Sequence, residues 1–395
     1  MTTVNGTTTA KFDQVRQVFA RQLSREVGAS VCVWHNGEIV VDLWGGFRDR
    51  AKSIPWDAET ISIVFSATKG VVAVAMLMLV DRGLLDLERE VAAYWPEFAA
   101  NGKSEISVRT LLNHRAGLIT VDPPITLEML ENEPALLAEI LARQAPQWSP
   151  GTDQGYHGVT FGLYVGELFR RVAGVSVGRF IADEIAGPLG ADFFLGIEPA
   201  DESRVAEIIP VGKRERLFKV VPKLLFHRGT EGRVFRSVAL GRDSAKAFSN
   251  PRELGLGALA NFNTERVHHL ELPWCSGIGN ARGLSRIYAA VANGGQLGNV
   301  HLFDVNCIES LKSRQSWSEC DRVLCKPVGW SQGFLKEEGT FSPNRESFGH
   351  SGAGGSLGWC DPVANIAIGY VMNQMDHHIR SPRAISLCQA VYACL

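Results

Sequence analysis

The chain has 395 residues, of which 45% are hydrophobic and 21% charged, enough to bury a full hydrophobic core without disulfide or metal support. Its formal net charge of −2 provides no overall positive field, so neither nucleic acid nor an anionic membrane is expected as a partner. The first twelve residues are polar and unlike a secretory signal, and no apolar run reaches membrane-spanning length, which predicts a cytoplasmic protein.

Residues 29–46 contain two β-rich runs joined by Asn36-Gly37. Asn-Gly readily takes the positive φ angles of a tight hairpin, so this segment predicts two paired strands. Residues 66–84 are apolar on nearly every side, which predicts a helix buried all round. That run is short for a membrane span and carries Lys69 near one end.

The middle of the chain has a different pattern. Residues 86–200 show helical periodicity punctuated by Pro and Gly, with no comparable strand signal. Residues 201–260 are less regular and rich in basic side chains. These are Lys213, Arg214, Arg216, Lys219, Lys223, Arg228, Arg233, Arg236, Arg242 and Lys246. We interpret this segment as a solvated surface loop, with a lid that shapes a substrate pocket as the alternative.

The last third predicts a helix at 281–293, strands at 329–335, before Ser351 and at 366–373, and a C-terminal helix near 385–393. Strands at both ends with helices between them indicate an α/β (α+β) fold. One sheet domain would comprise residues 1–85 and 260–395. Residues 86–259 would form an inserted, mainly helical domain, in which 201–259 holds the alternative lid.

The sharpest local pattern is Ser66-Ala67-Thr68-Lys69, an S-x-x-K sequence at the start of the predicted buried helix. Positions three apart share a helix face, so the lysine amine can reach the serine hydroxyl. Burial among apolar neighbours would lower the pKa of Lys69 and make it a base for Ser66. Free N–H groups at a helix start favour the negative charge of acyl transfer. Alone, the pattern also fits a helix N-cap and a lysine that extends to solvent.

Four further motifs follow this SATKG pattern in order along the chain: VDRGLLDLEREVAAYWPEF at 80–98, LLNHRAGL at 111–118, WSPGTDQGYHGVTFG at 148–162 and FGHSGAGGSLGWCDP at 348–362. With them the chain resembles the serine β-lactamase-like superfamily, closest to the carboxylesterases called family VIII esterases. The resemblance implies the β-lactamase and penicillin-binding-protein fold, an antiparallel sheet flanked by helices with an inserted, mainly helical domain. It runs over nearly the whole chain and is weakest at 201–260.

The resemblance assigns roles by position. Ser66 matches the acylated serine, Lys69 the lysine of S-x-x-K, and Tyr156 the tyrosine that shares the proton traffic from across the cleft. A phenol beside an ammonium is stabilised as phenolate, which predicts that Tyr156 takes the serine proton. An ordinary tyrosine of the helical domain is the alternative. The N–H groups of Ser66 and Ala353 would form the oxyanion hole.

Other residues are predicted to bind substrate. His350-Ser351-Gly352 stands where β-lactamases carry Lys-Thr-Gly, and His350 would hydrogen-bond near Tyr156 or the substrate, with a buried structural histidine as the alternative. His157 and Trp359 are further candidates, although large aromatics more often belong to the core.

Two departures from β-lactamases favour a neutral ester as substrate. Tyr156-His157-Gly158 lacks the asparagine of Tyr-x-Asn, and His350 replaces a lysine that could bind a penicillin carboxylate. The resemblance therefore implies hydrolysis of short-chain acyl esters, with at most weak β-lactam hydrolysis. An acyltransferase, a D-amino-acid peptidase or amidase, and a non-catalytic binding or scaffold protein remain as alternatives, and a homo-oligomer is an open alternative to a monomer.

Two competing patterns carry less weight. Residues 354–358 fit G-x-S-x-G, but no helix pattern follows Ser356, as a nucleophile elbow requires. The eight cysteines form no C-x-x-C pair, and His268-His269 and His377-His378 lack a carboxylate partner at ligand spacing. No phosphate-binding glycine loop follows a strand either. We therefore predict free thiols, no metal and no cofactor.

Overall fold

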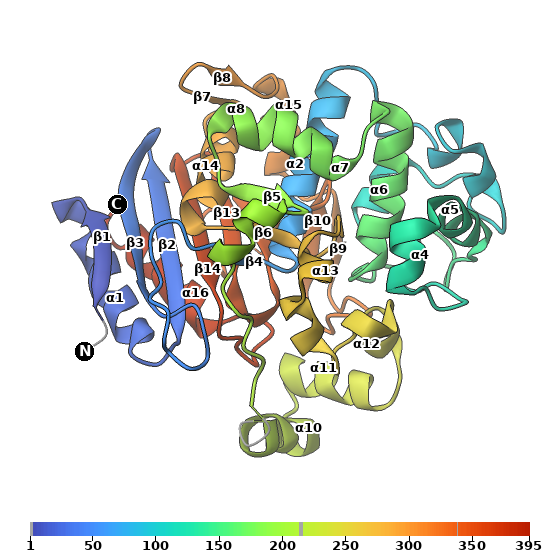
Figure 1. The fold of residues 1–395 in the computed structure, drawn as a ribbon. Helices are drawn as coiled ribbons and strands as arrows, with labels where there is room; N and C mark the ends of the chain where they lie inside the picture. The colour runs from blue at the N-terminus through green and yellow to red at the C-terminus, as the bar shows by residue number, and fades with distance from the viewer. Residues whose placement is uncertain (1–2, 213–215, 338) are drawn as a thin grey trace.

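The computed structural model describes residues 3–212, 216–337 and 339–395 (Figure 1). Within these ranges nine strands form one sheet in the order β1-β3-β2-β14-β13-β12-β11-β10-β9, and all neighbouring strands are antiparallel. The strands are β1 (Val4–Thr8), β2 (Gly28–His35), β3 (Glu38–Gly46), β9 (Ser316–Ser318), β10 (Val328–Ser331), β11 (Phe334–Lys336), β12 (Phe348–Ser351), β13 (Leu357–Asp361) and β14 (Ile366–Met372). Both ends of the chain therefore build the sheet.

The hairpin predicted at Asn36-Gly37 is confirmed by β2 and β3, and the two turn residues have φ angles of 53° and 79°. The sheet edge beyond this hairpin is β1, which the polar N-terminal sequence did not predict. β14 pairs with β2, so the strand expected at 366–373 lies in the middle of the sheet.

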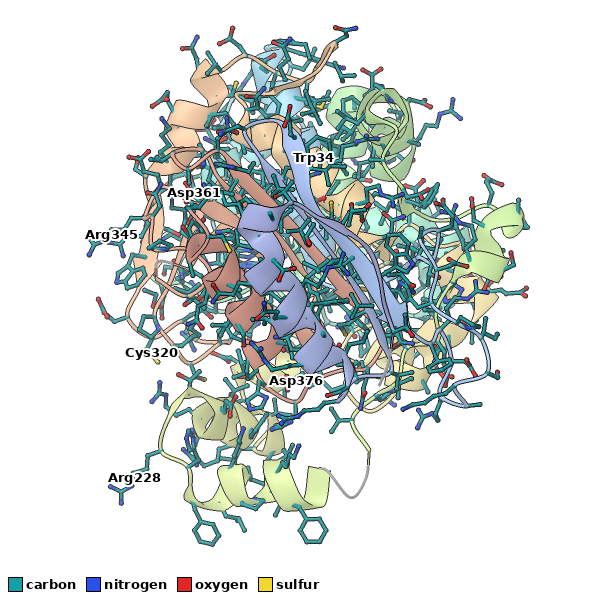
Figure 2. The ribbon with its side chains drawn as sticks, turned by 90° about the vertical axis from the view of Figure 1, so that its left-hand side faces the viewer. Trp34, Arg228, Cys320, Arg345, Asp361 and Asp376 are labelled. Atoms are coloured by element: carbon teal, nitrogen blue, oxygen red, sulfur yellow. The ribbon has the colours of Figure 1, made fainter. Side chains whose placement is uncertain are left out.

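Helices cover both faces of the sheet. α1 (Asp13–Leu23) and α16 (Pro382–Tyr392) pack against each other on one face (Figure 2). α2 (Ala67–Asp81) and α14 (Ala281–Ala292) pack on the other face, against β12, β13 and β14. α2 is buried over almost its whole length, as its uniformly apolar sequence predicts.

The middle of the chain is mainly helical. Its helices are α3 (Val108–Leu112), α4 (Leu127–Asn132), α5 (Pro134–Arg143), α6 (Thr160–Ala173), α7 (Val177–Phe180), α8 (Gly187–Leu189) and α13 (Glu265–His268). One strand, β5 (Phe193–Leu195), interrupts them and joins β4 (Ser62–Ile63) and β6 (Gly277–Gly279) in a small second sheet. After α14 the chain forms the short strands β7 (Gln296–Leu297) and β8 (Val300–His301) and then α15 (Asn306–Lys312).

The basic segment is more regular than a surface loop. It forms α10 (Val221–Phe226), α11 (Thr230–Ala239) and α12 (Asp243–Lys246), and α10 projects from the body of the molecule at the bottom of Figure 1. The interpretation of residues 201–260 as an irregular loop is therefore wrong for these stretches. Lys213 and Arg214 lie outside the described residues.

Candidate active site

Ser66 and Lys69 lie at the start of α2, in the relation that S-x-x-K predicts. Ser66 immediately precedes the helix with helical backbone angles, and the Lys69 amine lies 3.2 Å from its hydroxyl oxygen. Lys69 Nζ also donates to the backbone oxygen of Trp274 at 2.9 Å. The lysine side chain is completely buried, and these contacts hold its amine against the serine.

Burial lowers the pKa of Lys69 from its ordinary value of 10.5 to about 7, with a small opposing effect from Cys275. The direction and the cause are those predicted from the apolar neighbours. Near neutral pH a large fraction of the Lys69 amines therefore carries a free lone pair, as a general base requires.

The chain enters α2 through a constrained backbone. Phe65 has a φ of 47°, a left-handed conformation that is uncommon for a bulky residue, and its ring contacts Phe262. Such conformations persist where the surrounding packing holds them, and they cluster at functional sites. At Gly70, a Cβ atom would lie 1.9 Å from the Tyr288 hydroxyl, so α14 approaches α2 closely beside Lys69. Neither feature can be read from local sequence.

Tyr156 faces this pair from the helical half of the molecule. The Lys69 amine lies 5.0 Å from the centre of its ring, which stacks on Trp330 at 5.4 Å with nearly parallel planes. The hydroxyl is buried without a well-formed hydrogen bond among the described residues, although the Ser66 hydroxyl lies close enough to lower the phenol pKa. The structure thus brings Ser66, Lys69 and Tyr156 together.

The expectation of a Tyr156 phenolate is wrong for this arrangement. Burial raises the pKa of Tyr156 well above its ordinary value, more than the Ser66 hydroxyl and the Arg380 charge lower it. The expected stabilising ammonium is also only partly present near neutral pH, because the same burial lowers the pKa of Lys69 to about 7. The phenol of Tyr156 therefore keeps its proton near neutral pH.

A buried carboxyl fixes the backbone of Tyr156. Asp321 Oδ1 accepts hydrogen bonds from the N–H groups of Tyr156 at 3.1 Å, Val323 at 3.0 Å and Leu324 at 2.9 Å. Gln154 also donates to its second oxygen at 3.3 Å. Asp321 therefore joins two segments more than 150 residues apart in sequence. No local motif surrounds Asp321, so sequence reasoning missed it.

His157 points away from Ser66 and does not line the cavity beside it, contrary to the position expected of a substrate-binding residue. It is completely buried, and its Nε2 accepts a hydrogen bond from the N–H of Leu118 at 3.0 Å. Its Nδ1 lies 3.3 Å from Nδ1 of His114, which in turn accepts the N–H of His157 at 3.0 Å. Residues next to each other in the chain point in different directions here, and only Tyr156 reaches the site.

His350 lies on β12 beside the same cluster. Its Nδ1 is 2.8 Å from the backbone oxygen of Ser351, and its ring centre is 6.0 Å from that of Tyr156. Burial and the Lys69 charge lower the pKa of His350 well below its ordinary value, so the ring is neutral. Its Nε2 is buried and has no hydrogen-bond partner among the described residues. The free Nε2 of a neutral imidazole can form a hydrogen bond with a bound substrate.

The turn after β12 is locked to the strand that leads to Ser66. The hydroxyl of Ser356 donates to the backbone oxygen of Val64 at 2.6 Å, and the N–H of Gly352 donates to the oxygen of Ser356 at 2.8 Å. A Cβ atom on Gly352 would lie 2.1 Å from both the Ser356 hydroxyl and the Val64 oxygen. Ser356 is buried and leads into β13, not a helix, so it is no nucleophile elbow.

A cavity of about 220 Å³ opens in front of Ser66. Six of the predicted residues line it: Ser66, Tyr156, His350, Ser351, Gly352 and Ala353. The rest of the wall is mostly apolar, with a polar group at 376–380. These side chains are Val234, Phe248, Val323, Leu324, Trp330, Met375, Asp376, His378, Ile379 and Arg380.

Trp359 is not part of this cavity, and its prediction as a substrate-binding residue is wrong. In the β12–β13 pairing, His350 lies opposite Gly358 and Gly349 lies opposite Trp359. Side chains alternate between the faces of a sheet, so Trp359 points away from the face that carries His350. It is completely buried and packs against Phe341.

The carboxylate partners judged absent from two histidine pairs are present. Ligand atoms of Asp376, His377 and His378 lie within 4.8 Å of one another, and His268 Nδ1 lies 2.7 Å from Glu202. Folding brings Glu202 to His268, which lies 66 residues further along the chain. Asp376 is the residue directly before His377, and the spacing argument overlooked it. The absence of a metal stays a prediction.

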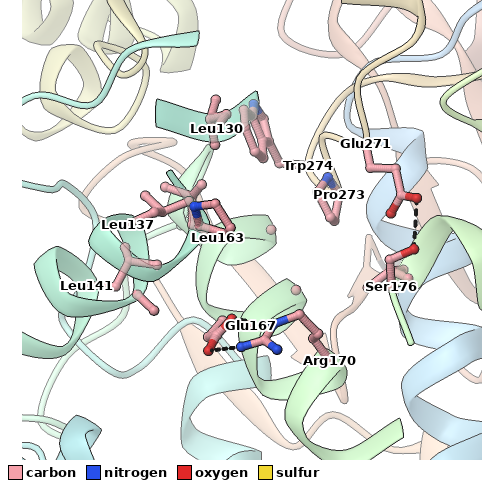
Figure 3. Close-up of a pocket in the computed structure, with 15 residues that line it drawn as sticks. Leu130, Leu137, Leu141, Leu163, Glu167, Arg170, Ser176, Glu271, Pro273 and Trp274 are labelled. Atoms are coloured by element: carbon pink, nitrogen blue, oxygen red, sulfur yellow. Dashed lines mark hydrogen bonds and ion pairs between the residues drawn. The ribbon is translucent and has the colours of Figure 1, made fainter. Parts of the chain in front are cut away.

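A second cavity, of about 150 Å³, lies between α4, α5 and α6 (Figure 3). Leucines and Pro273 form much of its wall, and the paired Glu167 and Arg170 form one side. It shares Trp274 with the surroundings of Lys69, because the Trp274 backbone oxygen accepts the lysine amine. Ser66 does not line this cavity.

Comparison with known proteins identifies the class of protein that has this fold and this site. Residues 15–387 match the Beta-lactamase family, so the chain belongs to that family. The match spans the large sheet except its edge strand β1, and it includes α2 and the motifs that line the cavity.

The relatives include esterases. The chain is 34% identical over 380 residues to "Esterase/beta-lactamase LipL" of Mycobacterium tuberculosis, covering 94% of this chain and 83% of that protein. A crystal structure of a family VIII carboxylesterase covers both chains completely with a TM-score of 0.87 and 36% identity. A penicillin-binding protein homolog from Caulobacter crescentus also covers both chains completely, with a TM-score of 0.85 and 31% identity.

The predicted family and fold are thereby confirmed, and the chain is a hydrolase of the esterase and β-lactamase type. In the described part of the chain, no helix is long and apolar enough to cross a membrane.

Proposed function

We propose that this protein is a serine carboxylesterase that hydrolyses short-chain acyl esters through an acyl-enzyme on Ser66. The observation that carries the proposal is the buried Lys69 amine, whose pKa is about 7 and whose nitrogen lies 3.2 Å from the Ser66 hydroxyl oxygen. A neutral amine at this distance can take the hydroxyl proton as the oxygen attacks an ester carbonyl.

The negative charge on the attacked carbonyl oxygen would be held by the N–H groups of Ser66 and Ala353, both on the cavity wall. The neighbouring N–H groups are used elsewhere: that of Ala67 donates to Val64 at 3.2 Å and that of Gly352 to Ser356 at 2.8 Å. The turn locked by Ser356 fixes the position of the second donor.

Because the Tyr156 phenol is protonated, it can pass a proton between the Lys69 amine and the leaving alcohol. As the ester C–O bond breaks, Tyr156 gives its proton to the leaving alcohol and receives one from the Lys69 ammonium. Water then attacks the acyl carbonyl and gives a proton to the Lys69 amine, and the Ser66 oxygen leaves with a proton as the acid is released. The enzyme returns to its starting protonation state.

The cavity wall supports an ester with an apolar acyl group. Val234, Phe248 and Leu324 line it, and about 220 Å³ accommodates a short chain. Slow hydrolysis at most is expected for β-lactams, because neutral His350 stands in place of a lysine.

Hydrolysis of a series of p-nitrophenyl acyl esters and of nitrocefin tests the proposal, together with fluorophosphonate labelling of the parent, Ser66→Ala and Ser356→Ala proteins. We expect rapid hydrolysis of the short esters, labelling of the parent and Ser356→Ala proteins, and neither reaction in Ser66→Ala. Retained labelling of Ser66→Ala, or its loss in Ser356→Ala alone, would refute the assignment.

A further inference from the structure

The segment 218–246 combines two features that a surface exposed only to water rarely shows together. Two of its hydrophobic side chains have the largest exposed fractions of any in the described residues: Phe226 is 81% exposed and Phe218 is 73% exposed. Leu225 and Leu240 are 62% and 63% exposed. Exposed apolar side chains gathered on one short segment of the chain indicate an interaction surface.

The same segment is strongly basic, although the whole chain is slightly acidic. It contains seven basic and two acidic residues, a formal charge of +5, against −2 for the whole chain. The basic residues are Lys219, Lys223, Arg228, Arg233, Arg236, Arg242 and Lys246. The rest of the chain is therefore net acidic, and the positive charge is concentrated at this projection.

Among the described residues, no ion pair joins Arg228, Arg233, Arg236, Arg242 or Lys246 to a carboxylate. Glu231 pairs with Lys223 at 2.5 Å, and Asp243 pairs with Arg322, outside the segment, at 2.8 Å. Arg233 and Arg236 donate to backbone oxygens, which do not cancel their charge. Arg228 points away from the body of the molecule in Figure 2.

We propose that the 218–246 segment docks on an anionic phospholipid surface, with Phe218, Leu225 and Phe226 entering the interface between headgroups and acyl chains. Amphipathic helices that combine apolar and basic side chains bind such interfaces without spanning the membrane. A second copy of this chain fits the face less well, because a symmetric contact would bring two charges of +5 together. The net charge of −2 for the whole chain argues against an anionic membrane as a partner. That argument does not apply to this segment, whose own formal charge is +5.

The position of the segment links docking to the esterase site. Val234 on α11 and Phe248, two residues after α12, line the cavity that contains Ser66. The docked element is therefore also a wall of that cavity, and apolar esters dissolved in a lipid surface are its substrate class. This last step rests on the proposed function, whereas docking does not.

Vesicle co-sedimentation of the full chain carrying Ser66→Ala measures docking without catalysis. Vesicles of phosphatidylglycerol and phosphatidylcholine are compared with pure phosphatidylcholine at low and high salt. We expect binding to the anionic vesicles only, weakened by salt. Arg228→Glu with Arg242→Glu should lower partitioning about twentyfold or more, since each basic residue near an anionic surface contributes about fivefold. Phe218→Asp with Phe226→Asp should abolish binding.

Matched controls are Arg345→Glu and Val363→Asp, because Arg345 is exposed elsewhere and Val363 is 61% exposed in the turn after β13. Equal weakening by these controls, or no preference for anionic vesicles, would overturn the proposal. So would light scattering that shows a dimer dissociated by Phe226→Asp, or stronger retention on DNA than on vesicles.

A second measurement separates docking from the esterase function. With Ser66 intact, Phe218→Asp with Phe226→Asp should slow hydrolysis of the butyryl ester of a long-chain alcohol in anionic vesicles at least about tenfold and leave soluble p-nitrophenyl butyrate hydrolysis unchanged. If the variant hydrolysed each of the two esters as fast as the parent does, delivery of the ester from the lipid surface would be refuted. Vesicle binding with no hydrolysis of either ester would refute the esterase function and leave docking intact.

Discussion

Two of the buried lysines, Lys69 and Lys103, hold their amines in different surroundings. Lys69 at the start of α2 and Lys103 in the loop before α3 are both completely buried. Burial lowers the pKa of Lys69 to about 7 and that of Lys103 to about 8. A lowered pKa therefore does not by itself distinguish a catalytic lysine from a structural one.

The partners of the two amines make the distinction. Lys103 Nζ donates to three backbone oxygens at 2.6 to 2.8 Å, which uses every hydrogen of an ammonium. These oxygens belong to Ala100, Ala142 and Gln144. Lys69 has one backbone oxygen and the Ser66 hydroxyl, so it can lose a proton without leaving several acceptors unpaired. Lys103 fastens the end of α5, whereas Lys69 stays available for proton transfer.

The largest expected effect is on catalysis at Lys69. Lys69→Met removes the base and should lower kcat/KM for p-nitrophenyl butyrate by about a thousandfold or more. Its folding should not suffer, because a thioether chain of similar length replaces a buried amine. Steady-state kinetics and urea unfolding measure the two effects. Activity near that of the parent would show that Lys69 is only structural.

Lys103→Met should give the reverse result. Three backbone oxygens lose their donor in a buried site, which should cost about 3 kcal/mol of the free energy of unfolding. The kcat/KM of the folded protein should change little, because Lys103 does not line the Ser66 cavity. Urea titration with kinetics at low denaturant measures both quantities. Unchanged stability would show that those three contacts contribute nothing.

The pH dependence sharpens the comparison. Below pH 7 Lys69 is an ammonium without a lone pair, so kcat/KM should fall about tenfold per pH unit there and level off above it. The lowered pKa of Lys69 also costs stability, fully below about pH 7 and less as pH rises toward 10.5. The stability advantage of Lys69→Met should therefore be largest at acidic pH and shrink toward pH 10.

A pH series of kcat/KM, with urea unfolding of the parent and Lys69→Met at each pH, measures both trends. A flat acidic limb would contradict the assignment of Lys69 as the base.

The sequence was informative where chemistry depends on local spacing. Ser66 and Lys69 are three residues apart on one helix, and Asn36-Gly37 specifies its own turn, so both predictions held. Burial of the flanking residues predicted the direction of the Lys69 pKa shift.

The errors arose where a role depends on contacts between distant segments. His157 follows Tyr156 directly, yet folding turns it toward His114 and Leu118. The side of the sheet on which Trp359 lies follows from its pairing with Gly349, which no local pattern reveals. The phenolate prediction failed because burial acts on both members of the pair at once.

The smallest expected effect lies at Ser356, which belongs to the same site but touches no reacting atom. Ser356→Ala removes the 2.6 Å hydrogen bond to Val64 and frees the turn that carries Ala353. The oxyanion donor would lose its fixed position, so kcat should fall about tenfold while KM stays near that of the parent, because a misplaced donor weakens transition-state stabilisation most. A Ser356→Thr protein, which keeps the hydroxyl, should recover part of the loss. A rise in KM alone, or no recovery by threonine, would indicate that the side chain only fills space beside the cavity.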